Sequence, residues 1–96
     1  PDNSTLIAAS QQLLLAAKTG EPVDSLVQFF AAVPFQQLQK ELSTDAKAKA
    51  FWLNIYNSYT QVLLQQNPDA YKNRNRFFKN KQILIAGKKL SLDFIE

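Results

Sequence analysis

The chain has 96 residues, of which 46% are hydrophobic and 11% aromatic, and its formal net charge is +3. A chain of this length and composition forms one folded domain, and its aromatic content excludes an intrinsically disordered protein. It contains neither cysteine nor histidine, which excludes a disulfide framework, a thiolate nucleophile, an imidazole base and a Cys/His zinc site. We therefore expect no cofactor and no metal site, and no catalysis by this chain alone.

The sequence carries no membrane or targeting signal. No apolar run approaches the roughly 20 residues that cross a bilayer, so we expect a soluble protein without membrane insertion. The first residues, PDNST, lack the basic start and the apolar centre of a signal peptide. Because the sequence does not begin with methionine, a signal peptide removed by processing stays an open alternative, and the compartment is undecided.

Three short amphipathic helices are predicted before residue 43. Asn3 or Ser4 can cap the first helix, and Gly20 is a stop signal after it. Pro34 ends the second helix and suits the first turn of the third. In each helix the apolar residues recur at intervals of three and four: Leu6, Ala9, Leu13, Leu14 and Ala17; Leu26, Phe29, Phe30 and Val33; Phe35, Leu38 and Leu42.

A fourth, longer helix contains KAFWLNIYNSYTQVLL, residues 49–64. Ser43 or Thr44 can cap it, and Asn67-Pro68 should end it because the residue before a proline avoids the helical region. Its apolar residues cover roughly 220° of a helical wheel drawn at 100° per residue. A surface helix needs an apolar stripe of only about 100°, so we expect this helix to lie at the centre of the fold.

The rest of this helix is a polar arc formed by Asn54, Ser58, Gln61 and Gln65, with Asn57 at its edge. One interpretation is that the arc is the solvated face of the helix. The other is a buried amide network that fixes packing or lines a site, since a buried asparagine needs hydrogen-bond partners. We expect Asn57 to be more buried than Ser58 or Gln61 and to bond to backbone outside its own helix. Gln65 should lie on the solvated side.

The composition changes after Pro68. Residues 1–71 contain four basic and six acidic residues, a net charge of −2, whereas residues 72–96 contain seven basic and two acidic residues, a net charge of +5. A basic segment interleaved with aromatic residues can be a phosphate or nucleic-acid surface, or a solvated segment. Because the motifs of the common nucleic-acid modules are absent, we expect no specific nucleic-acid binding, only a salt-sensitive attraction.

A β-hairpin is predicted within KQILIAGKKLSLDF. Gln82–Ala86 is rich in β-formers, and Gly87 can take a positive φ in the turn before Lys89–Leu90. Two strands are marginally stable alone, so they must lie on the helices or pair with other strands. Ser91 can cap a helix that begins in SLDFIE, and we expect that helix to continue in a larger domain.

Two motifs in this order resemble an uncharacterised protein family. The segments FWLNIYN (residues 51–57) and GKKLSLDFIE (residues 87–96) resemble the "domain of unknown function" family numbered 547. That family's patterns are AFW-N-YN and G-LSLDDIEH, and the match covers roughly Lys47 to Glu96. Phe94 stands where the family has a second aspartate, and the sequence ends before the family's usual histidine and its later cysteine.

The resemblance implies the first half of a domain that occurs in bacteria and plants and whose activity is not established. Two functions stay open. In the first, Asn54, Asn57 and Glu96 contribute to the polar site of a hydrolase-type enzyme that the family's histidine and cysteine complete. In the second, the chain belongs to a non-catalytic protein-interaction or scaffold module.

The predicted fold class is mainly α (α+β). Three amphipathic helices pack around the long central helix, and a short β-hairpin follows. Residues 1–67 form the helical part, and residues 68–96 form the basic segment with the hairpin and the start of a helix; together they make one domain fragment. An unfinished apolar surface or an open strand edge leads us to expect self-association.

Overall fold

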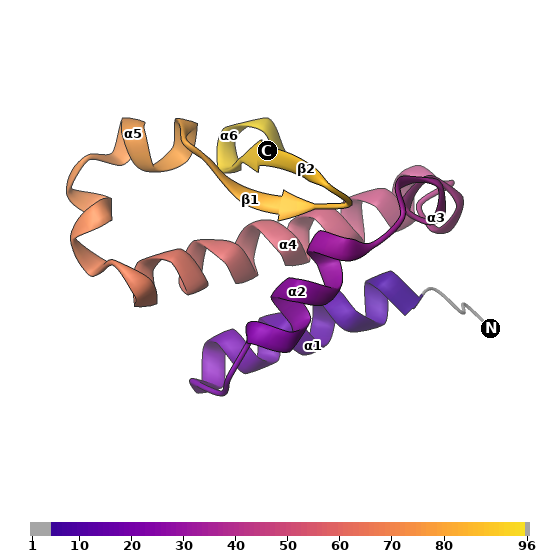
Figure 1. Cartoon of the computed structure of the whole chain (residues 1–96), viewed down its shortest axis with the longest axis horizontal. Helices are drawn as coiled ribbons and strands as arrows, with labels where there is room; N and C mark the ends of the chain where they lie inside the picture. The colour runs from indigo at the N-terminus through magenta and orange to yellow at the C-terminus, as the bar shows by residue number, and fades with distance from the viewer. Residues whose placement is uncertain (1–4, 96) are drawn as a thin grey trace.

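The computed structural model describes residues 5–95, and most of these residues are helical (Figure 1). The elements in chain order are α1 (Thr5–Thr19), α2 (Asp24–Ala32), α3 (Phe35–Glu41), α4 (Asp45–Gln66), the 3₁₀ helix η1 (Pro68–Lys72), α5 (Arg74–Lys79), β1 (Lys81–Ile85), β2 (Lys88–Ser91) and α6 (Leu92–Ile95). The predicted mainly α (α+β) class is confirmed, with three short helices, one long helix and a C-terminal hairpin.

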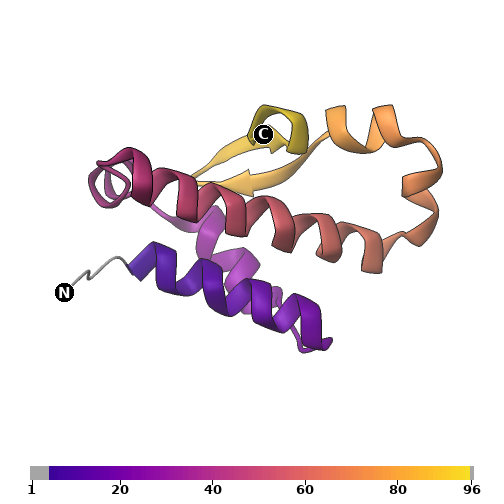
Figure 2. The same cartoon turned by 180° about the vertical axis from the view of Figure 1, so that it is seen from behind.

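Helix α4 lies in the centre, with α1 on one side and the hairpin and α6 on the other (Figures 1 and 2). Its side chains Phe51, Ile55 and Tyr59 belong to one core cluster with residues of α1, α2, α5 and β1. Phe51 meets Phe30 of α2 edge to face, with 5.8 Å between the ring centroids. The wide apolar arc of α4 therefore does hold several neighbours, as expected of a central helix.

The predicted helix ends agree with the structure wherever the residues are described. The Thr44 hydroxyl accepts the backbone N–H of Lys47 at 3.2 Å, and the Ser91 hydroxyl accepts that of Phe94 at 3.1 Å. Asn3 and Ser4 lie outside the described residues. At the start of α1, Glu41 Oε1 accepts the backbone N–H of Leu6 at 3.0 Å. A carboxylate 35 positions away thus satisfies an amide that the helix leaves unpaired.

The hairpin is fastened to α2 through its turn. Ala86 and Gly87 have φ angles of 53° and 74°, the two positive values that a tight two-residue turn requires. Their backbone N–H groups donate to the carbonyl oxygens of Phe30 and Ala31 at 2.8 and 3.0 Å. These two bonds satisfy carbonyls at the end of α2 that have no partner within the helix. The hairpin therefore lies on the helices. This is one of the two ways in which a two-stranded hairpin can be stabilised, the other being pairing with further strands.

Residues 68–80 contain more helix than the sequence suggested, since only a basic stretch was expected there. Asn73 caps α5 by accepting the backbone N–H of Arg76 at 3.2 Å, and Phe77 is buried. Phe77 and Phe78 both meet the ring of Tyr71 edge to face. The six-residue helix α5 is far too short to be stable by propensity, so packing of its aromatic side chains holds it.

Tyr59 is a core residue with an unsatisfied polar atom. Its side chain is 3% exposed, and its hydroxyl makes no hydrogen bond within residues 5–95. Leaving such a group buried without a partner costs about 1–3 kcal/mol. Tyr59→Phe is therefore expected to raise the free energy of unfolding by about 1 kcal/mol, or about 4–8 °C in Tm, measured by thermal unfolding in circular dichroism. A lower Tm would show that the hydroxyl contributes to folding.

The same substitution should change how stability depends on pH. Burial raises the pKa of the Tyr59 phenol well above its ordinary value of 10.0. The unfolded chain therefore releases this proton first, and the free energy of unfolding falls as the pH rises above about 10. Tyr59→Phe has no phenol to titrate and does not lose stability in this way. The difference in free energy of unfolding between this variant and the wild type should therefore grow between about pH 9 and pH 11. An advantage that stays constant over that range would contradict the raised pKa.

Candidate functional site

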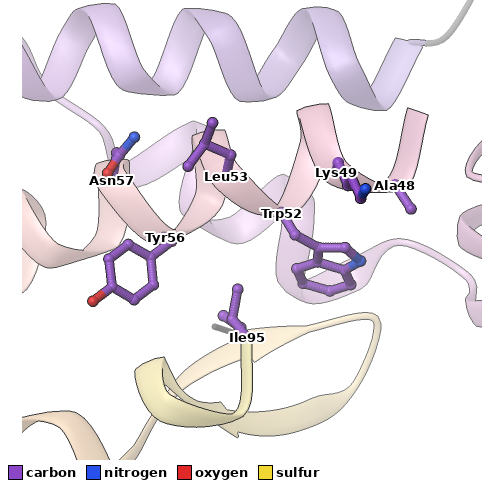
Figure 3. Close-up of a pocket in the computed structure, with 7 residues that line it drawn as sticks. All are labelled: Ala48, Lys49, Trp52, Leu53, Tyr56, Asn57 and Ile95. Atoms are coloured by element: carbon purple, nitrogen blue, oxygen red, sulfur yellow. The ribbon is translucent and has the colours of Figure 1, made fainter. Parts of the chain in front are cut away.

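An open groove runs along α4 beside α6. Its cavity volume is about 600 Å³, within the range of ligand-binding clefts. Figure 3 shows Trp52 and Tyr56 on the side of α4 that faces Ile95, whereas Leu53 and Asn57 point the other way. We call this surface the α4–α6 groove and define it by the residues that line it: Ala48, Lys49, Trp52, Leu53, Tyr56, Asn57 and Ile95.

Aromatic contacts hold the two large rings of the groove in place. The Trp52 ring lies edge to face against Phe51, which is fully buried, at a centroid distance of 4.8 Å. The Tyr56 ring stacks on Phe78 of α5, with 6.4 Å between centroids and 12° between planes. Aromatic pairs of this geometry add about 0.5–1.5 kcal/mol to the burial of their area. The groove therefore presents a supported apolar surface.

The polar arc of α4 turns out to be the contact with α1. Asn54 Nδ2 donates to Ser10 Oγ at 3.1 Å, and Gln65 Nε2 donates to the carbonyl oxygen of Ala17 at 2.9 Å. Ser58 lies between them on the same arc and is fully buried. The interpretation of the arc as a solvated face is wrong at its centre, where Ser58 is buried. Gln65 is exposed, as expected, although its side chain also bonds to α1. The alternative, an amide network that fixes packing, holds for Asn54.

The expectation for Asn57 is also wrong. Asn57 is exposed, whereas Ser58 is buried and Gln61 half-buried, and the Asn57 side chain makes no hydrogen bond within residues 5–95. The physical reason is that α1 packs on the centre of the arc, where Ser58 lets it approach, and leaves the edge uncovered. Leu53, next to Asn57 on the wheel, is 61% exposed for the same reason.

Of the three candidate site residues, the structure describes two, and these two lie in different surroundings. Asn54 is engaged with α1, Asn57 lines the α4–α6 groove, and Glu96 lies outside the described residues. Within residues 5–95, no three His, Cys, Asp or Glu side chains lie close enough to hold a metal ion. Across the same span, no helix combines the length and the apolar character needed to cross a membrane.

Comparison with known protein families decides the family. The family described as "Protein of unknown function, DUF547" matches residues 39–96, more than half of the chain. The chain belongs to the DUF547 family. The predicted resemblance is thereby confirmed, and the matched region begins eight residues before Lys47. No curated protein and no solved structure matches the chain.

The DUF547 match includes every residue of the groove and also a residue that sequence reasoning did not place in the site. Phe94 is 76% exposed and lines a second, smaller hollow of about 280 Å³ with Trp52, Leu90 and Ile95. The sequence did indicate that Phe94 is exposed. Leu92 and Ile95 are spaced to share the apolar face of α6, and Phe94 lies outside that face. The two hollows share Trp52 and Ile95, so Phe94 stands beside the groove.

The charges around the groove of this DUF547 chain are few. Lys49 is the one charged residue among those that line it, and Asp93 precedes Phe94 on α6. Both side chains are exposed, and neither has an ion-pair partner within residues 5–95. Two aromatic rings, an amide and a lysine can bind an apolar side chain together with a carboxylate.

Proposed function

We propose that this DUF547 chain is a protein-interaction module and that its α4–α6 groove binds a second copy of the chain. The observation that carries the proposal is the position of Phe94. Its ring is 76% exposed and lines the smaller hollow. That hollow shares Trp52 and Ile95 with the apolar α4–α6 groove, so Phe94 lies beside the groove. A protruding aromatic side chain and an apolar groove on one face meet the requirement for a two-fold interface, in which each copy contributes both.

The exposed apolar surface supports this arrangement. Leu53 and Phe94 are 61% and 76% exposed, and the half-buried Trp52, Leu90 and Ile95 line the smaller hollow together with Phe94. Clustered exposed apolar side chains on a small protein mark interaction surfaces, whereas single ones are ordinary. Aromatic side chains are also the most frequent anchors of protein interfaces. Insertion of Phe94 into the groove of the partner subunit would cover the larger part of this surface.

The charges fit the same arrangement. Asp93 is the neighbour of Phe94, and Lys49 is the charged residue that lines the groove. When Phe94 enters the groove of the partner subunit, Asp93 approaches Lys49 of the partner subunit. Charge pairs at the rim of an interface fix its register and its specificity. A helix or strand from an unrelated protein would lack this built-in match.

Phe94→Asp is expected to abolish self-association. The wild type should show a mass that rises from 10.9 kDa toward twice that value as its concentration is raised, measured by light scattering after size exclusion. Phe94→Asp should stay at 10.9 kDa, because the aspartate removes the anchor and adds a charge that the groove cannot bury. Leu15→Asp is the matched control, since Leu15 is 64% exposed on α1. It should associate like the wild type.

A charge exchange tests the proposed register. Lys49→Asp and Asp93→Lys should each weaken the dimer, and the double variant should regain most of the lost affinity, because it restores opposite charges with the signs reversed. A wild type that remains monomeric at all concentrations would overturn the proposal. So would a Phe94→Asp variant that associates as well as Leu15→Asp, which would indicate pairing through an open strand edge.

The hydrolase-type alternative has less support in the described residues. Asn54, one of its candidate residues, donates to Ser10 across the contact of α1 and α4 and is used in packing. Asn57 lines the groove, and in the interaction proposal its amide contributes hydrogen bonds to the bound copy.

A further inference from the structure

Another hollow, separate from the two beside α6, lies at the other end of α4, between η1, α5 and β1. Its cavity volume is about 400 Å³, and none of its lining residues belongs to the α4–α6 groove. Its lining residues are mostly polar or charged, in contrast to the mostly apolar residues of the groove. We call it the η1–α5 hollow. Its chemistry is set by the apolar side chain of Phe77, four carboxamides, and the charged residues Asp69, Lys72 and Arg76.

The carboxamides are the first unusual feature of the hollow. Asn67, Asn73, Asn80 and Gln82 line it, from the end of α4, both ends of α5 and the first strand. A carboxamide carries both donors and an acceptor, so several of them around one cavity suit a ligand with several hydroxyl groups. Two are held in place by bonds of their own: Asn73 Oδ1 accepts the N–H of Arg76 at 3.2 Å, and Gln82 Nε2 donates to the carbonyl oxygen of Phe77 at 2.9 Å.

The charges of the hollow favour an anion. Asp69 pairs with Lys72 at 3.5 Å, whereas no carboxylate within residues 5–95 pairs with Arg76. The three charged lining residues sum to +1, and no acidic residue occurs between Lys72 and Lys89 to oppose them. A guanidinium binds a carboxylate or phosphate group through two parallel hydrogen bonds. Arg76 is therefore positioned as the anion-binding group of the hollow.

The floor of the hollow is rigid. Phe77 is 2% exposed, and its ring meets Tyr71 and Phe78 edge to face. The short helix that carries Arg76 is closed at both ends, by the Asn73 cap and by the bond from the Asn80 N–H to the carbonyl oxygen of Arg76 at 2.9 Å. Lining groups that are already fixed lose little freedom when a ligand binds.

We propose that the η1–α5 hollow binds a small hydroxylated anion, such as a sugar phosphate or a sugar acid. Arg76 binds the phosphate or carboxylate group, and the carboxamides bind the hydroxyls. The ligand is a small molecule because the hollow has a cavity volume of about 400 Å³, within the range of small-molecule sites. This site is independent of the proposed self-association through the α4–α6 groove.

The proposal is tested by titrating the isotope-labelled chain with four probes and following its backbone amide resonances. The probes are glucose 6-phosphate, glucuronate, glucose and inorganic phosphate. We expect glucose 6-phosphate or glucuronate to shift the resonances of Asn73, Arg76, Asn80 and Gln82, and the tighter of the two identifies the anionic group. Glucose and inorganic phosphate should each bind at least about tenfold more weakly, because each lacks one half of the recognised chemistry.

Matched variants separate the site from the general basic charge. Arg76→Gln should weaken binding about tenfold or more, whereas Arg74→Gln should leave it within about twofold. Arg74 is the control because its guanidinium lies over the Tyr71 ring, 5.3 Å from the centroid, and does not line the hollow. Asn80→Ala, which removes a carboxamide but no charge, should weaken binding several-fold. The same titration with Phe94→Asp should give the wild-type affinity.

Three results would overturn the proposal. The first is the absence of saturable shifts with both sugar anions. The second is equal binding of inorganic phosphate and glucose 6-phosphate, which would show an adventitious anion only. The third is an equal loss of affinity in Arg74→Gln and Arg76→Gln, which would show attraction to the basic segment as a whole.

Discussion

Phe51→Ala is expected to remove most of the free energy of unfolding of the chain. Phe51 is fully buried at the centre of α4, where it meets Phe30 of α2 and Trp52. Truncation of a buried phenylalanine to alanine costs about 3–5 kcal/mol, from lost burial and from the cavity left behind. The total stability of a small domain lies near the low end of about 5–15 kcal/mol. Urea denaturation followed by far-ultraviolet circular dichroism measures the loss.

The control for Phe51→Ala is Leu15→Ala. Leu15 is 64% exposed on α1, so its truncation should change the free energy of unfolding by less than about 0.5 kcal/mol. If the two variants unfolded at the same urea concentration, Phe51 would not be the centre of the core. Because Phe51 also supports Trp52, a destabilised but folded Phe51 variant should bind a second copy less well than Leu15→Ala.

Ser58→Leu should have the second largest effect on stability. Ser58 is fully buried and lies between the two bonds that join α4 to α1, from Asn54 to Ser10 and from Gln65 to Ala17. A leucine at this position has no room unless α1 moves away, and overpacking of this kind costs about 1–3 kcal/mol. The polar bonds on either side would lengthen as the helices separate, which adds to the loss.

Ser58→Ala is the matched variant. The Ser58 hydroxyl donates at 2.5 Å to the carbonyl oxygen of Asn54 in its own helix, a local bond that contributes little to packing. Alanine keeps the small volume, so its Tm should stay close to that of the wild type. Equal Tm values for the leucine and alanine variants would show that α1 does not pack closely against this arc.

The helices and the hairpin could be predicted because their signals are local. Thr44 caps α4 three residues ahead of the N–H it accepts, and Gly87 lies within the turn that needs its positive φ. The apolar periods of α1 and α3 likewise lie within one helix. The short helix α5 was missed because its stability depends on Phe77 reaching the core, which no local pattern shows.

The orientation of α4 could not be predicted, because a helical wheel shows which residues share a face but not which neighbour covers it. The polar arc looked solvated, yet α1 supplies a hydroxyl from Ser10 and a carbonyl from Ala17 that satisfy it. The exposed side of α4 passes instead through Leu53 and Asn57. The groove therefore lies on residues that the sequence suggested were core. Asn57 lines the groove because α1 covers the centre of the polar arc and leaves its edge exposed, which the helical wheel alone could not show.

The most direct test of the proposed interface is a filtered nuclear Overhauser experiment on a mixture of isotope-labelled and unlabelled chains. Such an experiment detects only contacts between different copies. We predict contacts from the Phe94 ring of one copy to the Trp52 ring and the Leu53 methyl groups of the other, and their loss in Leu53→Asp. Contacts between copies that involve only the edges of β1 or β2, with none from Phe94, would contradict the account.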